Sequence, residues 1–150
     1  MNNIFNPDFE DFIKLLNKNE IEYMLVGGYA VILHGYSRTT GDMDLWVKKD
    51  KANYAKIMKA FEEFGMPVFE MTEDNFLNND SLDVFTFGRP PVSIDILNSV
   101  KGLKFEEAYK NSEIRNIEGL DIRLISLQDL LKAKKASARP RDINDIENLK

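Results

Sequence analysis

The feature that most constrains this chain is an apolar run broken by two adjacent glycines. Residues 21–26 are mostly apolar and suit a β-strand, Gly27 and Gly28 follow, and residues 30–33 have room for a short helix before Gly35. Residues 42–47 then predict another strand. The pattern therefore predicts a strand, a glycine turn, a short helix and a second strand in succession.

Two aspartates alternate along the second of these strands. Because successive side chains of a strand point to opposite faces, Asp42, Asp44 and Trp46 are expected to share one face, while the apolar residues between them are buried. The same alternation in residues 92–97 places Asp95 opposite its apolar neighbours. If the two strands are neighbours in the sheet, three carboxylates converge.

Paired carboxylates at this spacing predict a metal site. On a strand, alternate Cα atoms lie about 6.5–7 Å apart, so the two charges repel unless a cation lies between them. The chain has no cysteine and one histidine, so oxygen must ligate the metal, which favours Mg²⁺ or Mn²⁺. The alternative is that Asp42 and Asp44 belong to the solvated face of an exposed strand.

The glycine pair predicts a phosphate site. Glycines between a strand and a helix let backbone N–H groups approach an anion closely, and a triphosphate is the natural ligand. Gly-Gly also occurs simply as a tight turn, and neither a Walker lysine nor the Rossmann glycine spacing is present here. The phosphate interpretation therefore depends on the acids that follow.

These residues resemble a known signature. Gly27-Gly28, Asp42-x-Asp44 and Asp95 are similar to the three-part motif of the DNA polymerase beta-like nucleotidyltransferase superfamily, in its minimal bacterial form. Residues 34–44 and residues 132–149 are similar to nucleotidyltransferases related to abortive-infection and toxin–antitoxin enzymes. The resemblance implies an α+β fold, with a mixed twisted sheet, helices packed on one face, the active site on the other, and C-terminal helices.

The resemblance also implies roles for the motif residues. Asp42 and Asp44 would bind both metal ions, and Asp95 would complete one metal site and assist deprotonation of an acceptor hydroxyl. Gly27 and Gly28 would hold the triphosphate of a nucleoside triphosphate (NTP). Many relatives carry serine at the position of Gly28, where its hydroxyl helps to bind phosphate.

Several further residues have both a functional and a structural interpretation. Arg38 could bind phosphate bidentately or be a surface arginine, and Thr40 could contact nucleotide or hold its own loop. Lys132, with Lys135 at helical spacing, could line the cleft and neutralise phosphate, or belong to a solvated charged face. His34 is favoured as a helix-end residue over a catalyst, and Trp46 as a packed aromatic over a base-stacking platform.

The remaining elements follow from caps, periodicity and turns. Residues 66–81 lack periodicity and are expected to be a loop, while Gly88–Pro91 is expected to be a hairpin turn. Three predicted helices cover residues 7–18, 105–110 and 126–136. A further helix is expected to begin after Asp50 and end at Gly65, and another to begin at Pro140. The predicted hairpins join residues 82–87 to 92–97 and residues 113–117 to 120–124.

Length and composition favour one domain over residues 1–150, because 150 residues with 43% hydrophobic content build one core more readily than two. No leader segment and no apolar stretch of about 18 residues is visible, so a cytoplasmic location without membrane association is expected. The net charge of −5 argues against nonspecific coating of nucleic acid, although residues 132–141 contain five basic residues and no acidic one until Asp142.

The sequence therefore predicts an enzyme that moves a nucleoside monophosphate from an NTP to an acceptor hydroxyl and releases pyrophosphate. The acceptor could be tRNA, a protein or a small molecule. One alternative is a catalytically weak or inactive nucleotide-binding or partner subunit of a toxin–antitoxin-like system, with an antitoxin as partner. Another is a metal-dependent phosphohydrolase. A monomer and a homodimer both fit the sequence.

Overall fold

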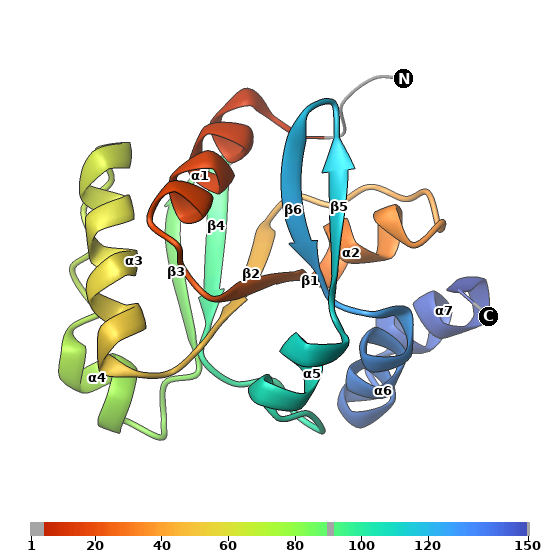
Figure 1. The fold of residues 1–150 in the computed structure, drawn as a ribbon. Coiled ribbons are helices and arrows are strands. Elements are labelled where there is room, and N and C mark those ends of the chain that lie inside the picture. Colours follow the sequence, from red (N-terminus) through yellow and green to blue (C-terminus); the bar gives the residue numbers. More distant parts are fainter. Residues whose placement is uncertain (1–4, 90–91, 150) are drawn as a thin grey trace.

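The computed structural model describes residues 5–89 and 92–149, and within them it contains one six-stranded mixed sheet with helices around it (Figure 1). The elements in chain order are α1 (Pro7–Lys18), β1 (Tyr23–Val26), α2 (Gly27–Leu33), β2 (Met43–Val47), α3 (Lys51–Phe64), α4 (Glu73–Asn78), β3 (Val84–Arg89), β4 (Val92–Leu97), α5 (Phe105–Asn111), β5 (Glu113–Ile117), β6 (Leu120–Leu124), α6 (Leu127–Ser137) and α7 (Pro140–Leu149).

The helix boundaries follow from capping side chains. Asn6 accepts a hydrogen bond from the Asp8 backbone N–H at 2.8 Å and starts α1, with Pro7 in the first turn. Asp50 caps α3 in the same way, and Gly65 ends that helix in the left-handed conformation with φ of 79°. Ser126 caps α6 through the Asp129 N–H. These caps agree with the predicted starts of these three helices.

The strands lie in the order β3-β4-β2-β1-β6-β5. Two antiparallel hairpins, β3–β4 and β5–β6, form the two edges. In the centre β2 runs antiparallel to β1 and parallel to β4, while β1 runs parallel to β6. The predicted mixed sheet of an α+β fold is confirmed, and the parallel pairing of β2 with β4 is the feature that forms the site below.

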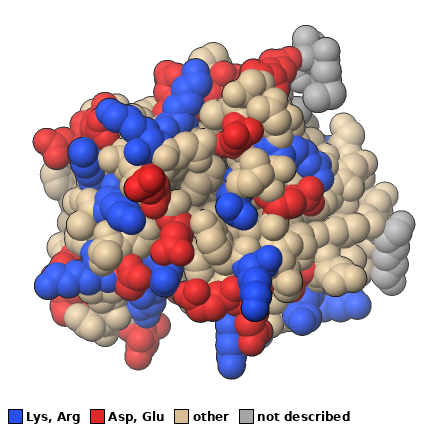
Figure 2. All heavy atoms as spheres, viewed as in Figure 1, with Lys and Arg blue, Asp and Glu red and all other residues tan. Residues whose placement is uncertain are grey.

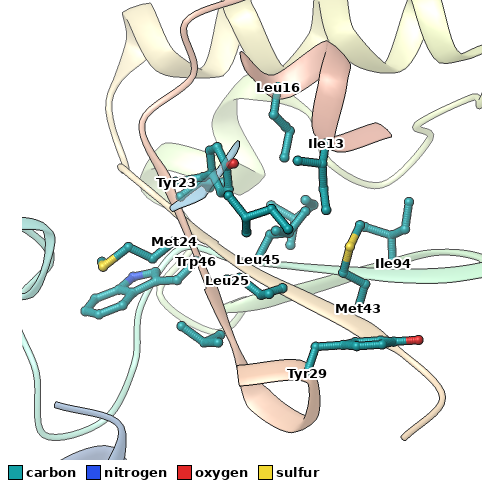
Figure 3. Packing of buried hydrophobic residues seen from close by; sticks show 14 of the residues in the cluster. Ile13, Leu16, Tyr23, Met24, Leu25, Tyr29, Met43, Leu45, Trp46 and Ile94 are labelled. Atoms are coloured by element: carbon teal, nitrogen blue, oxygen red, sulfur yellow. The ribbon is translucent and has the colours of Figure 1, made fainter. Parts of the chain in front are cut away.

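One face of the sheet packs against α1 and α3, which lie side by side (Figure 1). In Figure 3, Ile13 and Leu16 of α1 point toward Leu45 of β2, and all three are fully buried. Met24 and Trp46 are cross-strand partners on the opposite face. Trp46 is only 1% exposed and packs edge-to-face on Phe105 at 5.3 Å, so it is a packed aromatic as favoured from the sequence.

Three predicted boundaries differ from the structure. The expected loop at residues 66–81 contains α4, which Thr72 caps; it buries only Phe76, so it is too short to show a helical pattern. Helix α2 begins at Gly27, so the glycines form its first turn instead of preceding it. Gly88 belongs to β3, while Pro90 and Pro91 of the predicted turn lie outside the described residues.

Across the described part of the chain, no helix is both long and apolar enough to span a bilayer.

Candidate active site

A cleft of about 780 Å³ opens where α2, the segment before β2, and the α6–α7 corner meet the sheet. It brings together every predicted site residue except Lys132: Gly27, Gly28, Arg38, Thr40, Asp42, Asp44 and Asp95. Lys134, Arg139 and Arg141 complete its basic wall. Residues from most of the sequence therefore converge on one cavity.

Two of the three aspartates are direct neighbours in the sheet. Asp44 of β2 is the register partner of Asp95 of β4, so their side chains lie on the same face. Asp95 accepts a 2.7 Å hydrogen bond from the Thr86 hydroxyl of β3, which orients its carboxylate. Asp42 lies just before β2 and is exposed at the cleft.

The three carboxylates do not form a closed coordination shell as they stand. Within residues 5–89 and 92–149, no group of three or more Asp, Glu, His or Cys side chains is arranged to hold a metal ion. Asp44 and Asp95 are adjacent, whereas Asp42 lies before β2 and is exposed.

Asp44 is the most perturbed acid of the site. Burial, followed by the adjacent Asp95 and the charge of Asp42, raises the pKa of Asp44 to about 8, against the opposing effect of Lys134. Its Oδ1 atom is buried without a hydrogen-bond partner. A buried carboxylate oxygen is costly unless a donor or a cation satisfies it. The orphaned oxygen and the all-oxygen donor set therefore fit a hard divalent cation.

Close contacts require both glycines, and the backbone conformation also requires Gly27. Gly27 has φ of +68°, and a Cβ atom there would lie 2.1 Å from Asp44 Oδ2. A Cβ atom at Gly28 would lie 2.1 Å from the Thr40 hydroxyl oxygen. The backbone of the glycine turn thus contacts the carboxylate on one side and a threonine hydroxyl on the other.

The basic wall is held by two buried acids of α7. Asp145, which is fully buried, receives two hydrogen bonds from Arg38 at 2.9 and 3.1 Å and an ion pair from Lys134 at 2.9 Å. Asp142 pairs with Arg139 at 2.8 Å and with Lys134 at 3.4 Å. Burial opposes ionisation of Asp142, but the bonds from Arg139 and the charge of Lys134 lower its pKa overall.

The structure does not bring Lys132 into the cleft. Lys132 is exposed, whereas Lys134 is buried and lines the cavity. Side chains two positions apart on a helix point about 200° apart, so only one of the two can face the cleft. The sequence contains a signal for Lys134, because it lies four residues after the buried Leu130, on the same helical face.

His34 lies outside the cleft lining and has a structural contact. His34 follows the last residue of α2, and its Nε2 atom is 2.7 Å from the carbonyl oxygen of Ile125. This contact agrees with the helix-end interpretation.

A family match identifies the class of protein to which this chain belongs. Residues 8–150 match the family described as nucleotidyltransferase of unknown function (DUF6036), and the chain belongs to this family. No curated protein matches the chain in sequence.

Solved structures share the fold. The chain is similar to TM1012 of Thermotoga maritima, described as a candidate nucleotidyltransferase (TM-score 0.63, 14% identity, 93% of this chain and 88% of that one). It is also similar to the lincosamide antibiotic adenylyltransferase LnuA with bound lincomycin (0.62, 19%, 99% and 98%). A third is ANT(2″)-Ia in complex with adenylyl-2″-tobramycin (0.59, 16%, 94% and 84%). At these identities the likeness shows the fold alone.

Proposed function

We propose that this protein, acting as one nucleotidyltransferase domain, transfers a nucleoside monophosphate from an NTP to an acceptor hydroxyl and releases pyrophosphate. The observation that carries the proposal is the pair Asp44–Asp95, side by side on parallel strands with an unsatisfied Asp44 oxygen, in a cleft whose opposite wall is basic. Carboxylates that face basic side chains across one cleft are an arrangement that suits phosphoryl transfer.

Asp44, Asp95 and a reoriented Asp42 are the residues that would hold Mg²⁺ or Mn²⁺. When bound, such an ion supplies charge neutralisation of the phosphates and acidifies the acceptor hydroxyl. Asp95, whose carboxylate accepts a hydrogen bond from Thr86, would accept the proton of that hydroxyl.

The phosphates would lie between the glycine turn and the basic wall. The backbone at Gly27 and Gly28 has no side chain between it and the cleft, and Arg38 and Lys134 contribute positive charge. Thr40 places its hydroxyl in the space that a side chain at Gly28 would occupy. We infer that Thr40 replaces the serine hydroxyl that many relatives carry at the Gly28 position.

The acceptor class remains to be chosen among tRNA, protein and small molecules. Two structural neighbours are described with an antibiotic, lincomycin in one and an adenylylated tobramycin in the other. On the face in Figure 2, lysine and arginine are interspersed with aspartate and glutamate, so that face carries no continuous basic patch for a polyanionic acceptor.

A second function is a catalytically weak or inactive nucleotide-binding subunit, for example the partner of an antitoxin. The observation that favours it is that the three aspartates are not gathered into one metal-binding group in the described residues. In that case NTP would bind without transfer.

The test incubates the protein with each α-³²P-labelled NTP and either Mg²⁺ or Mn²⁺. Each reaction contains one candidate acceptor: total RNA, cell-extract protein, a lincosamide or an aminoglycoside. Transfer is expected to label one acceptor class, and the label should disappear in Asp44→Ala but persist in the control Lys132→Ala. Saturable NTP binding without labelling would favour the binding subunit, and free monophosphate alone would indicate hydrolysis. Absence of NTP binding with either metal would refute the enzyme and the nucleotide-binding subunit alike.

A further inference from the structure

The outer side of β3 carries an apolar groove that shares no lining residue with the cleft, although Thr86 of the groove hydrogen-bonds to Asp95 of the cleft. β3 is one edge of the sheet and β5 is the other (Figure 1). A hollow of about 620 Å³ lies between residues 64–70 and residues 85–89, with the rings of Phe64, Phe69, Phe85 and Phe87 in its lining. Phe69 is 83% exposed, more than any other large hydrophobic side chain in the described residues. An aromatic side chain left in water beside an apolar hollow marks an interaction site.

The backbone of β3 is available for pairing. An edge strand directs the N–H and C=O groups of alternate residues away from the sheet. In the part of the chain that the structure describes, no loop or turn backbone hydrogen bond reaches residues 84–89. Arg89, at its end, is the one charged residue of β3, whereas the shorter β5 has Glu113 and Arg115 along its length. β3 therefore lacks the charges that discourage pairing at natural sheet edges.

The segment that contributes residues 64–70 and 85–88 to this groove is strongly acidic in sequence, while the groove lining itself holds one acid, Glu70, and one base, Arg89. Residues 60–88 contain seven of the 25 acidic residues and no basic residue, which leaves 18 acidic against 20 basic residues elsewhere. The negative net charge of the chain therefore comes from this segment. Glu63 pairs with Lys18 and Asp80 approaches Lys49 at 4.0 Å. The ion pairs found among residues 5–89 and 92–149 include none of the other five, which are Glu62, Glu70, Glu73, Asp74 and Asp83.

We propose that this edge binds an extended segment of a partner protein that adds a strand to β3, carries basic residues, and places an apolar side chain in the groove beside Phe69. The open backbone edge supplies the hydrogen bonds, the groove supplies the apolar contact, and the unpaired acids select a positive partner. A second copy of this chain would bring its own acidic segment against the first, so like charges oppose a symmetric pairing of two β3 edges. The same charges oppose nucleic acid.

The test uses a short fluorescein-labelled peptide in which lysine alternates with valine around one central phenylalanine. One matched peptide replaces every lysine by glutamate, and another replaces the valine nearest the central phenylalanine by proline. Fluorescence anisotropy at low salt is expected to show the basic peptide binding about tenfold or more tighter than either control peptide. Amide NMR shifts on binding should map to residues 84–89 and 64–70, not to the β5 edge or the catalytic cleft.

Protein variants complete the test. Phe69→Ala and Glu70→Lys should each weaken the basic peptide about fivefold or more, and both sites are exposed, so folding should be retained. Ile114→Ala is the matched control, because Ile114 is 52% exposed on the other edge strand, and it should leave binding unchanged. Absence of binding, equal binding of the three peptides, or shifts outside the β3 edge would overturn the proposal. If the protein forms a dimer and Phe69→Ala dissociates that dimer, the occupant of the groove is a second copy, and the proposal is also overturned.

Discussion

The contact between Gly28 and Thr40 gives a sharp test of the proposed phosphate site. A serine at position 28 would place Cβ 2.1 Å from Thr40 Oγ1 and 2.7 Å from Thr40 Cβ, distances that real side chains do not reach. Overpacking of this kind costs about 1–3 kcal/mol. Gly28→Ser should therefore lose stability by about that amount and displace the Thr40 hydroxyl from the cleft.

Combining Gly28→Ser with Thr40→Gly should restore the NTP affinity that Thr40→Gly alone removes. In Thr40→Gly the hydroxyl is lost, which should weaken NTP binding by about 0.5–3 kcal/mol, the range for one hydrogen bond to a neutral or charged group. In the double variant Gly28→Ser/Thr40→Gly, the serine hydroxyl enters the vacated space. NTP affinity should then return close to that of the unaltered protein, with a coupling energy of about 2 kcal/mol.

The assays are urea unfolding followed by the fluorescence of Trp46, and NTP titration by calorimetry in the presence of Mg²⁺. Gly41→Ser is the matched control, because Gly41 lines the same cleft but a Cβ atom there meets nothing within 4 Å. If Gly28→Ser matched this control in stability and affinity, or if the two single effects simply added in the double variant, the inferred substitution of Thr40 for serine would be wrong.

Three further changes test the basic wall. Asp145→Asn removes the buried counter-ion of Arg38 and one of the two buried counter-ions of Lys134, which keeps Asp142. The free energy of unfolding should therefore fall by about 3–5 kcal/mol in urea titration, and a loss below about 1 kcal/mol would contradict the buried-pair argument. Folding lowers the pKa of Asp142, so the ionised carboxylate stabilises the fold above its unfolded pKa, and this contribution is lost as pH falls through the folded pKa. Asp142→Asn should therefore flatten the decline of the unfolding free energy below about pH 4. An unchanged decline at acid pH would refute this. Lys134→Met should raise the NTP Kd about tenfold, while Lys132→Met should leave the Kd unchanged in the same titration. A larger rise in Kd for Lys132→Met than for Lys134→Met would indicate that Lys132 contacts the phosphates instead.

Local chemistry made most of the fold predictable from the sequence. Caps such as Asn6 and Asp50 set helix starts, and strand parity placed Asp44 on the face opposite its apolar neighbours. Helix α4 could not be predicted, because six residues that bury only Phe76 leave no periodic signal.

Long-range contacts were the part that the sequence could not supply. That Asp44 and Asp95 meet depends on β4 pairing with β2, which no local pattern specifies. The bond between Arg38 and Asp145 joins residues 107 positions apart, so both residues look like ordinary surface charges when each is considered alone. The sequence also could not single out Lys134, because its contacts with the buried acids Asp142 and Asp145 of α7 depend on how α6 and α7 pack together.

The charges of the cleft make a final prediction about metal dependence. The four basic residues of the wall, which are Arg38, Lys134, Arg139 and Arg141, share the cleft with three aspartates, Asp42, Asp44 and Asp95. Two buried acids, Asp142 and Asp145, lie behind the wall. With all of them ionised the site carries one net negative charge, and with Asp44 protonated it is neutral. Neither state attracts a triphosphate strongly.

A divalent cation on the aspartates would reverse this balance and make the cleft positive. NTP affinity should therefore fall by about 100-fold or more when EDTA replaces Mg²⁺ in the calorimetric titration, and Asp44→Asn should reduce the difference between the two conditions. Equal NTP affinity with Mg²⁺ and with EDTA would show that the basic wall alone holds the phosphates, and would remove the metal from the proposed mechanism.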